Sequence, residues 1–129
     1  MTEATSAYAL TNIAIEGLAE KKGIDILRMD LTQVDSSVTD YFIICTGSSN
    51  RHVQSLAESA LEFVKKQTGE MPIAKEGLEA CEWVLLDFVN VVVHIFQQKT
   101  RDFYKLEDLW GDAELESIEV TPANSRKSA

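Results

Sequence analysis

Much that would mark a membrane or secreted protein is missing from this sequence. No apolar run approaches the roughly 18 residues that are needed to span a bilayer. The chain starts with acidic residues and has no basic residue before its first apolar stretch, whereas a secretory signal begins with positive charge. We therefore expect a cytoplasmic protein that does not enter a membrane.

Cysteine is scarce, with only Cys45 and Cys81 in the chain. Neither has a His or Cys at the spacing of a zinc site, so we expect no metal. A disulfide is disfavoured in a reducing compartment. We interpret both cysteines as packing residues, with a redox role as the alternative.

Basic residues are also few. The 12 Lys and Arg face 21 Asp and Glu, which gives a net charge of -9 and a pI near 4.6. A protein that binds nucleic acid directly needs a basic patch to displace counterions from phosphates. Direct binding of DNA or RNA is therefore disfavoured. A basic protein partner fits better, because opposite charge speeds encounter.

What the chain does contain is the pattern of one α/β domain, as its 129 residues and 45% hydrophobic content allow. The periodicities predict helices at 7–22, 50–68 and 101–110, and strands at 25–31, 41–46, 73–75, 83–88 and 91–97. This order predicts a mixed five-stranded sheet flanked by helices. Strand 41–46, helix 50–68 and strand 73–75 would form a parallel crossover. We expect a flexible start at 1–6, a domain at 7–112 and a disordered polar tail at 113–129.

The ends of these elements can also be predicted. Gly23 and Gly69 stand where C-terminal caps belong. The short gap between 83–88 and 91–97 predicts an antiparallel hairpin, in which Asn90 tolerates a positive φ best. In helix 101–110, an apolar stripe and a polar side are expected. The stripe comprises Phe103, Leu106 and Trp110, and the polar side comprises Arg101, Tyr104, Lys105 and Glu107.

The segment TGSSNRH, residues 46–52, joins a strand to a helix. Such a turn can bind phosphate on free helix amides, or it can simply cap the helix. Nucleotidyltransferases place a Gly-Ser turn here, but they need paired carboxylates to hold magnesium. Only Glu58 follows in the helix. The missing pair favours the cap and disfavours an enzyme.

Several other side chains have a structural and a functional interpretation. Trp83, Leu85 and Asp87 share one face of a strand. Trp83 and Asp87 form either an exposed anchor for a protein partner, or a half-buried core Trp beside an Asp that caps the turn. His94 is a satisfied histidine of the sheet or a surface group aimed at a partner. His52 either bonds to the adjacent loop or takes part in a site. Trp110 either covers the core or contacts a partner.

Five stretches carry a family resemblance when they are taken together. They are TDYFIICTGSSNRHVQSLA, a later EG, W-x3-D, VVVHIF and R-x2-Y-x-LE-x-LW. In this order they resemble the ribosomal silencing factor family, also called the Iojap family. The resemblance covers residues 8 to 112 and leaves the tails outside it.

The resemblance implies a fold similar to nucleotidyltransferases without their catalytic carboxylates, and therefore no enzyme activity and no cofactor. It implies binding to the large ribosomal subunit through large-subunit ribosomal protein 14. Members cover the surface that meets the small subunit, so that translation falls. Organelle relatives assist assembly of the large subunit, which is the alternative role.

The resemblance also marks positions in this chain. The matching polar and aromatic residues are Asp40, His52, Trp83, Asp87, His94, Arg101, Tyr104, Glu107 and Trp110. We expect the face of strands 83–88 and 91–97, together with helix 101–110, to dock on the partner. Trp83 and Tyr104 would be aromatic anchors, while Asp87 and Glu107 would meet basic side chains. Asp40 and His52 would be additional surface.

One departure concerns the hairpin, where this chain has Val89 and relatives usually have Gly. We expect a monomer or a weak homodimer. A homo-oligomeric scaffold and a nucleotide-binding enzyme are the rival hypotheses.

Overall fold

The computed structural model describes residues 6–34, 37–108 and 113–119. The elements follow in the order α1 (Ala7–Glu20), β1 (Ile24–Asp30), β2 (Tyr41–Gly47), α2 (Asn50–Thr68), β3 (Ala74–Glu76), β4 (Trp83–Asp87), β5 (Val91–Gln97), α3 (Gln98–Tyr104), a 3-10 turn (Leu106–Asp108) and β6 (Glu114–Ser117). The predicted bounds of α2 and β5 are confirmed, and those of the other strands differ by one or two residues. No helix in these ranges is long and apolar enough to cross a membrane.

The sheet has the strand order β3-β4-β5-β2-β1-β6. Only β2 and β5 are parallel neighbours, and the other pairs are antiparallel. The predicted α/β class with a mixed sheet is confirmed. The predicted crossover from β2 through α2 to β3 is right in direction, because the pairings make β2 and β3 parallel. The two strands are not adjacent, however, since β4 and β5 lie between them.

The predicted count of five strands is wrong, because β6 adds a sixth. Its residues Glu114 to Ser117 pair with Asp30 to Leu27 of β1. The expectation that the chain is disordered from residue 113 is therefore wrong for this segment. All four side chains of β6 are exposed, so no apolar alternation marks the strand in the sequence.

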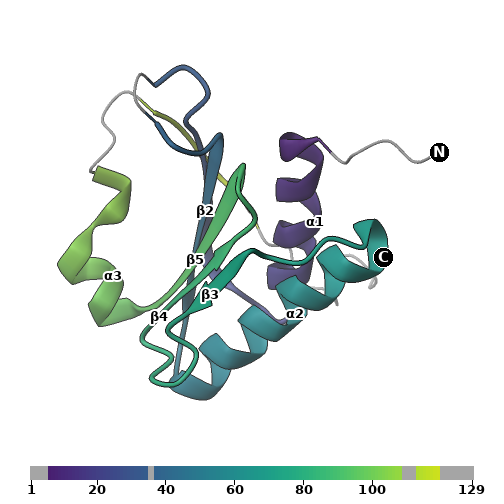
Figure 1. Cartoon of the computed structure of the whole chain (residues 1–129). Helices are drawn as coiled ribbons and strands as arrows, with labels where there is room; N and C mark the ends of the chain where they lie inside the picture. The colour runs from purple at the N-terminus through teal and green to yellow at the C-terminus, as the bar shows by residue number, and fades with distance from the viewer. Residues whose placement is uncertain (1–5, 35–36, 109–112, 120–129) are drawn as a thin grey trace, which may run out of the picture.

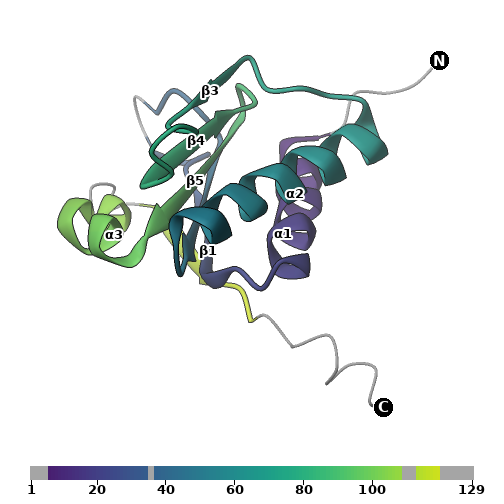
Figure 2. The same cartoon turned by 90° about the horizontal axis from the view of Figure 1, so that it is seen from below.

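Two helices cover one face of the sheet, and α3 lies on the other (Figures 1 and 2). The face under α1 and α2 holds the larger core, which includes Leu18, Ile26, Ile43, Val53, Leu56, Val84, Leu86, Val93 and Ile95. The helices approach closely because Gly17 has no side chain. A Cβ there would lie 2.8 Å from the Ser59 carbonyl oxygen. The Ser59 hydroxyl donates a 2.7 Å hydrogen bond to the Gly17 carbonyl at this crossing.

Of the two glycines that were predicted to cap helices, one does so. Gly69 ends α2 at φ 80, as predicted. Gly23 does not take the corresponding role after α1, because Lys22 holds the positive φ of 62 there. Gly23 instead leaves room for the Cys45 sulfur, which would lie 2.6 Å from an added Cβ. Both cysteines are buried and free, in accord with the packing interpretation.

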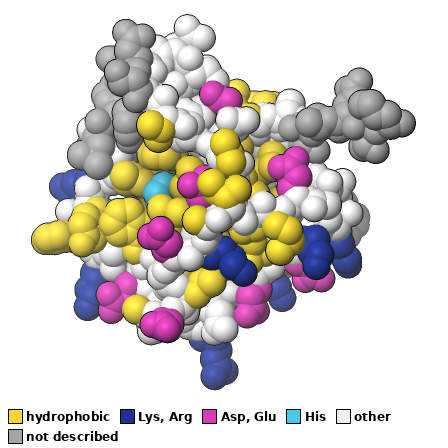
Figure 3. Space-filling model, viewed as in Figure 1, with side chains coloured by type: hydrophobic (Ala, Val, Ile, Leu, Met, Phe, Trp, Pro, Cys, Tyr) yellow, Lys and Arg dark blue, Asp and Glu magenta, His cyan; other side chains and the backbone are white. Residues whose placement is uncertain are grey.

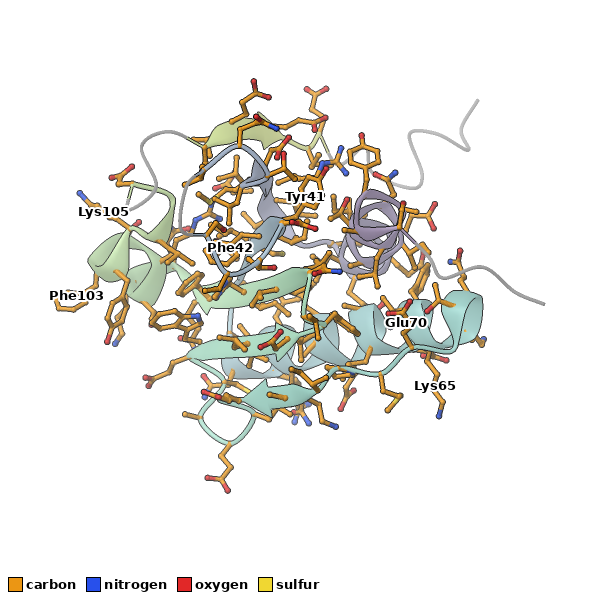
Figure 4. All side chains as sticks on the ribbon, turned by 45° about the horizontal axis from the view of Figure 1, so that its top comes forward. Tyr41, Phe42, Lys65, Glu70, Phe103 and Lys105 are labelled. Carbon is orange, nitrogen blue, oxygen red and sulfur yellow. The ribbon has the colours of Figure 1, made fainter. Side chains whose placement is uncertain are left out.

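The second face carries a smaller core. It comprises Leu27, Met29, Leu31, Phe42, Ile44, Val92, Phe96 and Leu106, with Trp83 and Leu85 half-buried at its margin. Neighbouring residues of β2 point to opposite faces, so Phe42 belongs to this core while Tyr41 contacts Tyr8 of α1 (Figure 4). Among the described residues, α3, the 3-10 turn, Val34 and Ala113 cover this side, and Trp83 and Leu85 stay only half-buried.

The predicted helix 101–110 is wrong in its bounds and in its faces. The helix starts at Gln98 and ends at Tyr104, where Lys105 takes a left-handed conformation with φ 46. Phe103, placed on the apolar stripe by its spacing, is 79% exposed. Arg101, placed on the polar side, is buried. Leu106 is buried as predicted, but through the 3-10 turn.

The antiparallel hairpin of β4 and β5 is confirmed. Its turn differs from the expectation, because Val89 and not Asn90 has the positive φ, which is 79. The amide of Val89 donates to the Asp87 carboxylate at 2.8 Å, so the turn-capping interpretation of Asp87 is correct.

Candidate docking face

The open side of the sheet carries a group of half-buried and exposed side chains, which we call the docking face. They are Trp83, Leu85 and Asp87 of β4, with Phe103 and Tyr104 of α3. In Figure 3, hydrophobic side chains run from α3 across the middle of the molecule, with acidic side chains at the margins of this band. The docking face thus joins two elements that are adjacent in space because β5 leads directly into α3.

Aromatic rings form the centre of the docking face. The Trp83 ring lies 4.8 Å from the Tyr104 ring and 4.9 Å from the Phe96 ring, centroid to centroid. Phe103 meets Tyr104 edge-on at 5.0 Å and points away from the sheet (Figure 4). Tyr104 is 48% exposed. The outer two rings are thus free to contact a partner, while Trp83 ties them to the sheet.

His94 lies beneath these rings. It is 4% exposed, and its ring contacts Phe42 at 4.7 Å. The Trp83 indole N–H donates a 3.0 Å hydrogen bond to His94 Nδ1. Burial lowers the pKa of His94 to about 4, so the ring is neutral at physiological pH with its proton on Nε2. His94 is therefore a buried sheet residue that a partner does not reach in this conformation.

Arg101 is also internal. Its Nη1 donates to the Asp25 carbonyl and to the Thr46 hydroxyl, each at 2.8 Å. These bonds fasten α3 to the ends of β1 and β2. Arg101 therefore holds the helix in place and does not present its charge on the docking face.

The carboxylates of the predicted site are dispersed. Asp87 lies on the docking face, half-buried, beside the hairpin turn that it caps. Asp40 precedes β2, and its backbone binds Leu31 and Asn90. Glu107 belongs to the 3-10 turn, but its side chain lies outside the described part of the structure, as does the whole of Trp110. The structure thus brings Trp83 and Tyr104 into contact, with His94 below Trp83, while Asp87 lies on the same face at the other end of β4.

His52 is remote from the docking face, at the start of α2. Its Nδ1 accepts from the Ser48 amide at 2.8 Å, and its Nε2 donates to the Lys21 carbonyl at 2.8 Å. The interpretation that His52 bonds to the adjacent loop is correct. The Ser49 hydroxyl accepts from the His52 amide at 3.0 Å.

The Gly-Ser turn is therefore a helix cap. The amides of Ser48, His52 and Val53 already have partners within the turn, so they are not available to a phosphate. Glu58 is exposed on α2 and accepts from Gln54. In the described ranges, no three His, Cys, Asp or Glu side chains are grouped as metal ligands would be.

A shallow hollow of about 350 Å³ adjoins the aromatic rings. It is lined by Glu82, Lys99, Thr100, Phe103 and Tyr104. Phe103 is the member of this site that the sequence pattern assigned to the core. The sequence carries no signal for this exposure, because the spacing of Phe103 and Leu106 fits one helical stripe, whereas α3 ends at Tyr104 and Leu106 lies in the 3-10 turn.

Fold and site together define a small α/β protein with a partly open aromatic face suited to binding another macromolecule. Residues 4–129 match the family described as ribosomal silencing factor during starvation. A ribosomal silencing factor from Bacillus subtilis is 39% identical over 114 residues, which cover 86% of this chain and 92% of that protein. One from Chromobacterium violaceum is 40% identical over 102 residues, or 79% of this chain and 82% of that protein. This chain belongs to the ribosomal silencing factor family.

Solved structures and organelle proteins extend the comparison. A crystal structure from Chromobacterium violaceum matches with a TM-score of 0.78 at 36% identity, covering 95% of this chain and 99% of that chain. A mouse protein named mitochondrial assembly of ribosomal large subunit protein 1 is 35% identical over 74 residues, which are 56% of this chain and 32% of that protein. The predicted family and fold class are confirmed.

Proposed function

We propose that this chain binds the large ribosomal subunit through large-subunit ribosomal protein 14 and blocks association with the small subunit. Membership of the ribosomal silencing factor family supports a role in translation. The name of the mouse relative supports the large subunit as the place of action. The partner protein and the steric block come from the family resemblance and are part of the proposal.

The observation that carries the proposal is the uneven covering of the sheet. Two long helices bury one face, while α3 leaves Phe103 and Tyr104 exposed beside the half-buried Trp83. Solvent-exposed aromatic residues that adjoin each other are typical anchors of protein interfaces. A partner that covers these rings would complete the smaller core.

The charge of the chain favours a basic partner. Asp87 lies on the docking face, and the exposed Glu82 and Asp102 lie beside it. Lys99 and Lys105 add positive charge at α3, so the preference for a basic partner depends mainly on the charge of the whole chain. With a net charge of -9, the whole molecule attracts a positively charged surface and repels bare phosphates. These facts support docking on a basic ribosomal protein more than on ribosomal RNA.

The mechanism requires no bond to be made or broken. Two bodies cannot occupy one surface, so an interface of roughly 1,600 Å² on the large subunit is enough to exclude the small subunit. Affinity then sets how much of the large subunit is sequestered at a given concentration of the factor. The protein would act as a monomer or a weak homodimer in the cytoplasm.

Co-sedimentation with purified large subunits tests the docking face. We expect Trp83→Ala and Tyr104→Ala to weaken binding at least tenfold, because each removes an aromatic anchor near the centre of the interface. Tyr8→Ala is the matched control, since Tyr8 is equally exposed at 48% but lies on α1. Melting temperatures verify that the variants fold. Normal binding by both docking-face variants would contradict the proposed surface.

Assembly of the large subunit is the alternative role, and the name of the mouse relative favours it. Loss of an assembly factor leaves incomplete large subunits, whereas loss of a silencing factor leaves complete ones. Sucrose gradients of a deletion strain, followed by the protein composition of the large-subunit peak, separate the two. Self-association through the docking face is excluded if light scattering gives a monomer at micromolar concentration.

A further inference from the structure

Trp83 and His94 form a pair that the proposed function does not itself explain. In the β4–β5 register, Trp83 lies opposite Phe96 and Leu85 lies opposite His94, so the indole reaches His94 diagonally across the strands. The indole N–H and His94 Nδ1 are 3.0 Å apart. This bond selects the neutral tautomer of His94, with the proton on Nε2.

The other nitrogen of His94 is costly to bury. Nε2 has no hydrogen-bond partner among the described residues, although the ring is 4% exposed. Its neighbours are the rings of Phe42 and Phe96, which offer no acceptor in the ring plane. A phenylalanine at this position would fill similar space and would not bury Nε2, but it would leave the Trp83 N–H without its acceptor. Packing alone therefore does not account for histidine here.

In the described part of the chain, the side-chain hydrogen bond of His94 is the one to Trp83, which belongs to the docking face. One side of the Trp83 ring packs on Phe96, and another contacts Tyr104 at 4.8 Å. A tryptophan at the margin of a core has alternative rotamers, and a hydrogen bond to its N–H restricts them. The orientation of Trp83 in turn determines where Tyr104 rests.

We propose that His94 is a positioning residue of the docking face, which holds the Trp83 indole in the orientation that a partner recognises. The inference rests on the proposed function, because it concerns the same surface. His94 would act through Trp83 and would not itself touch the partner. Histidine is retained there at a cost in stability because it supplies an acceptor at Nδ1.

Two substitutions separate positioning from packing. His94→Phe keeps the ring and removes the acceptor, so we expect roughly tenfold weaker binding to large subunits. Its melting temperature should stay close to that of the wild type, because the unpaired Nε2–H is removed while the half-buried Trp83 N–H loses its acceptor. His94→Asn keeps an acceptor near the position of Nδ1 but leaves a cavity, so we expect a lower melting temperature with binding within about threefold of wild type. If His94 were purely structural, the variant with the greater loss of melting temperature would also show the greater loss of binding.

A double-mutant cycle tests whether His94 acts through Trp83. In a Trp83→Phe background, which lacks the donor, His94→Phe should weaken binding no further. In NMR spectra, the Trp83 indole N–H signal, assigned by its loss in Trp83→Phe, should shift upfield in His94→Phe and remain near its place in His94→Asn.

The outcomes distinguish the two proposals. Weaker binding by His94→Phe without loss of stability, absent in the Trp83→Phe background, supports the positioning role. If Trp83→Ala abolishes binding but His94→Phe binds as wild type, or if His94→Asn loses binding as fully as His94→Phe, the positioning role is wrong and the docking face stands. If wild-type protein does not bind large subunits, both proposals are wrong.

Discussion

Val89 holds a backbone conformation that branched side chains avoid. Its φ is 79, and it is half exposed at the tip of the β4–β5 hairpin. The Asp87 carboxylate and the strand pairing on both sides hold the turn in this shape. Left-handed geometry costs an L-residue about 1–2 kcal/mol, and more when Cβ is branched.

Replacing Val89 by glycine should therefore stabilise the protein. We expect Val89→Gly to raise the free energy of unfolding by about 1 kcal/mol, less than the strain itself because glycine adds entropy to the unfolded chain. Urea denaturation measures the difference. Asn90→Gly, one residue along in the same turn, is the control and should give no gain. A stability loss in Val89→Gly would mean that the turn is not strained.

The buried His94 should also make the stability of the protein depend on pH. Its pKa is lowered by burial from 6.5 to about 4 in the folded protein, so between these values the unfolded chain binds more protons. The contribution of His94 to the free energy of unfolding is fully present above pH 6.5 and decreases as the pH falls. By pH 4 the loss amounts to about 3 kcal/mol, since one pKa unit is worth about 1.36 kcal/mol.

Other groups also titrate in acid, so the comparison with His94→Phe isolates this contribution. Urea denaturation of both proteins at pH 7 and pH 4 should show a steeper loss for the wild type. Parallel stability profiles for the two proteins would show that His94 is not desolvated in the folded state.

At the scale of elements, the sequence identifies those whose apolar pattern matches their burial. In α2, Val53, Leu56, Ala57, Ala60 and Val64 follow the helical period and all are buried. Strand β5 is apolar except for His94 and Gln97, and its first six residues are buried because helices lie on both faces of the sheet. Long, strongly patterned segments are predictable because burial alone determines their composition.

Elements that are held in place by polar side chains cannot be predicted from an apolar pattern. Buried Arg101 fastens α3 through the Asp25 carbonyl and the Thr46 hydroxyl, and a charged residue is normally assigned to the surface. Strand β6 has four exposed side chains and is held by backbone pairing and by Arg28. The location of the docking face on β4 and α3 stays a prediction. Phe103 was assigned to the core because its spacing from Leu106 fits one helical stripe, whereas α3 ends at Tyr104 and Leu106 lies in the 3-10 turn.

Arg28 joins β6 to α1. It is buried, and its guanidinium donates to Thr11, Asn12 and Tyr8 of α1 and to Glu116 of β6. The Glu116 side chain is 59% exposed, so solvent screens much of the pair. Its importance is mainly local, because it is the one ion pair that joins β6 to the other described residues.

We expect Glu116→Gln to loosen β6 without unfolding the domain. The loss in global stability should be at most about 1 kcal/mol, because the pair is partly exposed. Hydrogen exchange of the β6 amides should accelerate clearly, since an edge strand opens locally. Glu114→Gln in the same strand is the control. Equal exchange in both variants would show that Arg28 does not hold the strand.

On the scale of the whole molecule, one asymmetry dominates. The face under α1 and α2 is a closed core, and the described residues cover the face under α3 only in part. The acidic charge adds a preference for a basic surface. A molecule of this kind can cover a surface of a larger partner. In the proposed function it blocks translation because its volume on the large subunit excludes the small subunit.

Subunit joining tests this account most directly. Purified small and large subunits are mixed at rising concentrations of the protein, and light scattering follows the formation of joined ribosomes. We predict that the wild type reduces joining in proportion to its occupancy of the large subunit, that Tyr104→Ala requires at least tenfold more protein, and that Tyr8→Ala behaves as wild type. Full joining by large subunits that are saturated with wild-type protein would contradict the account.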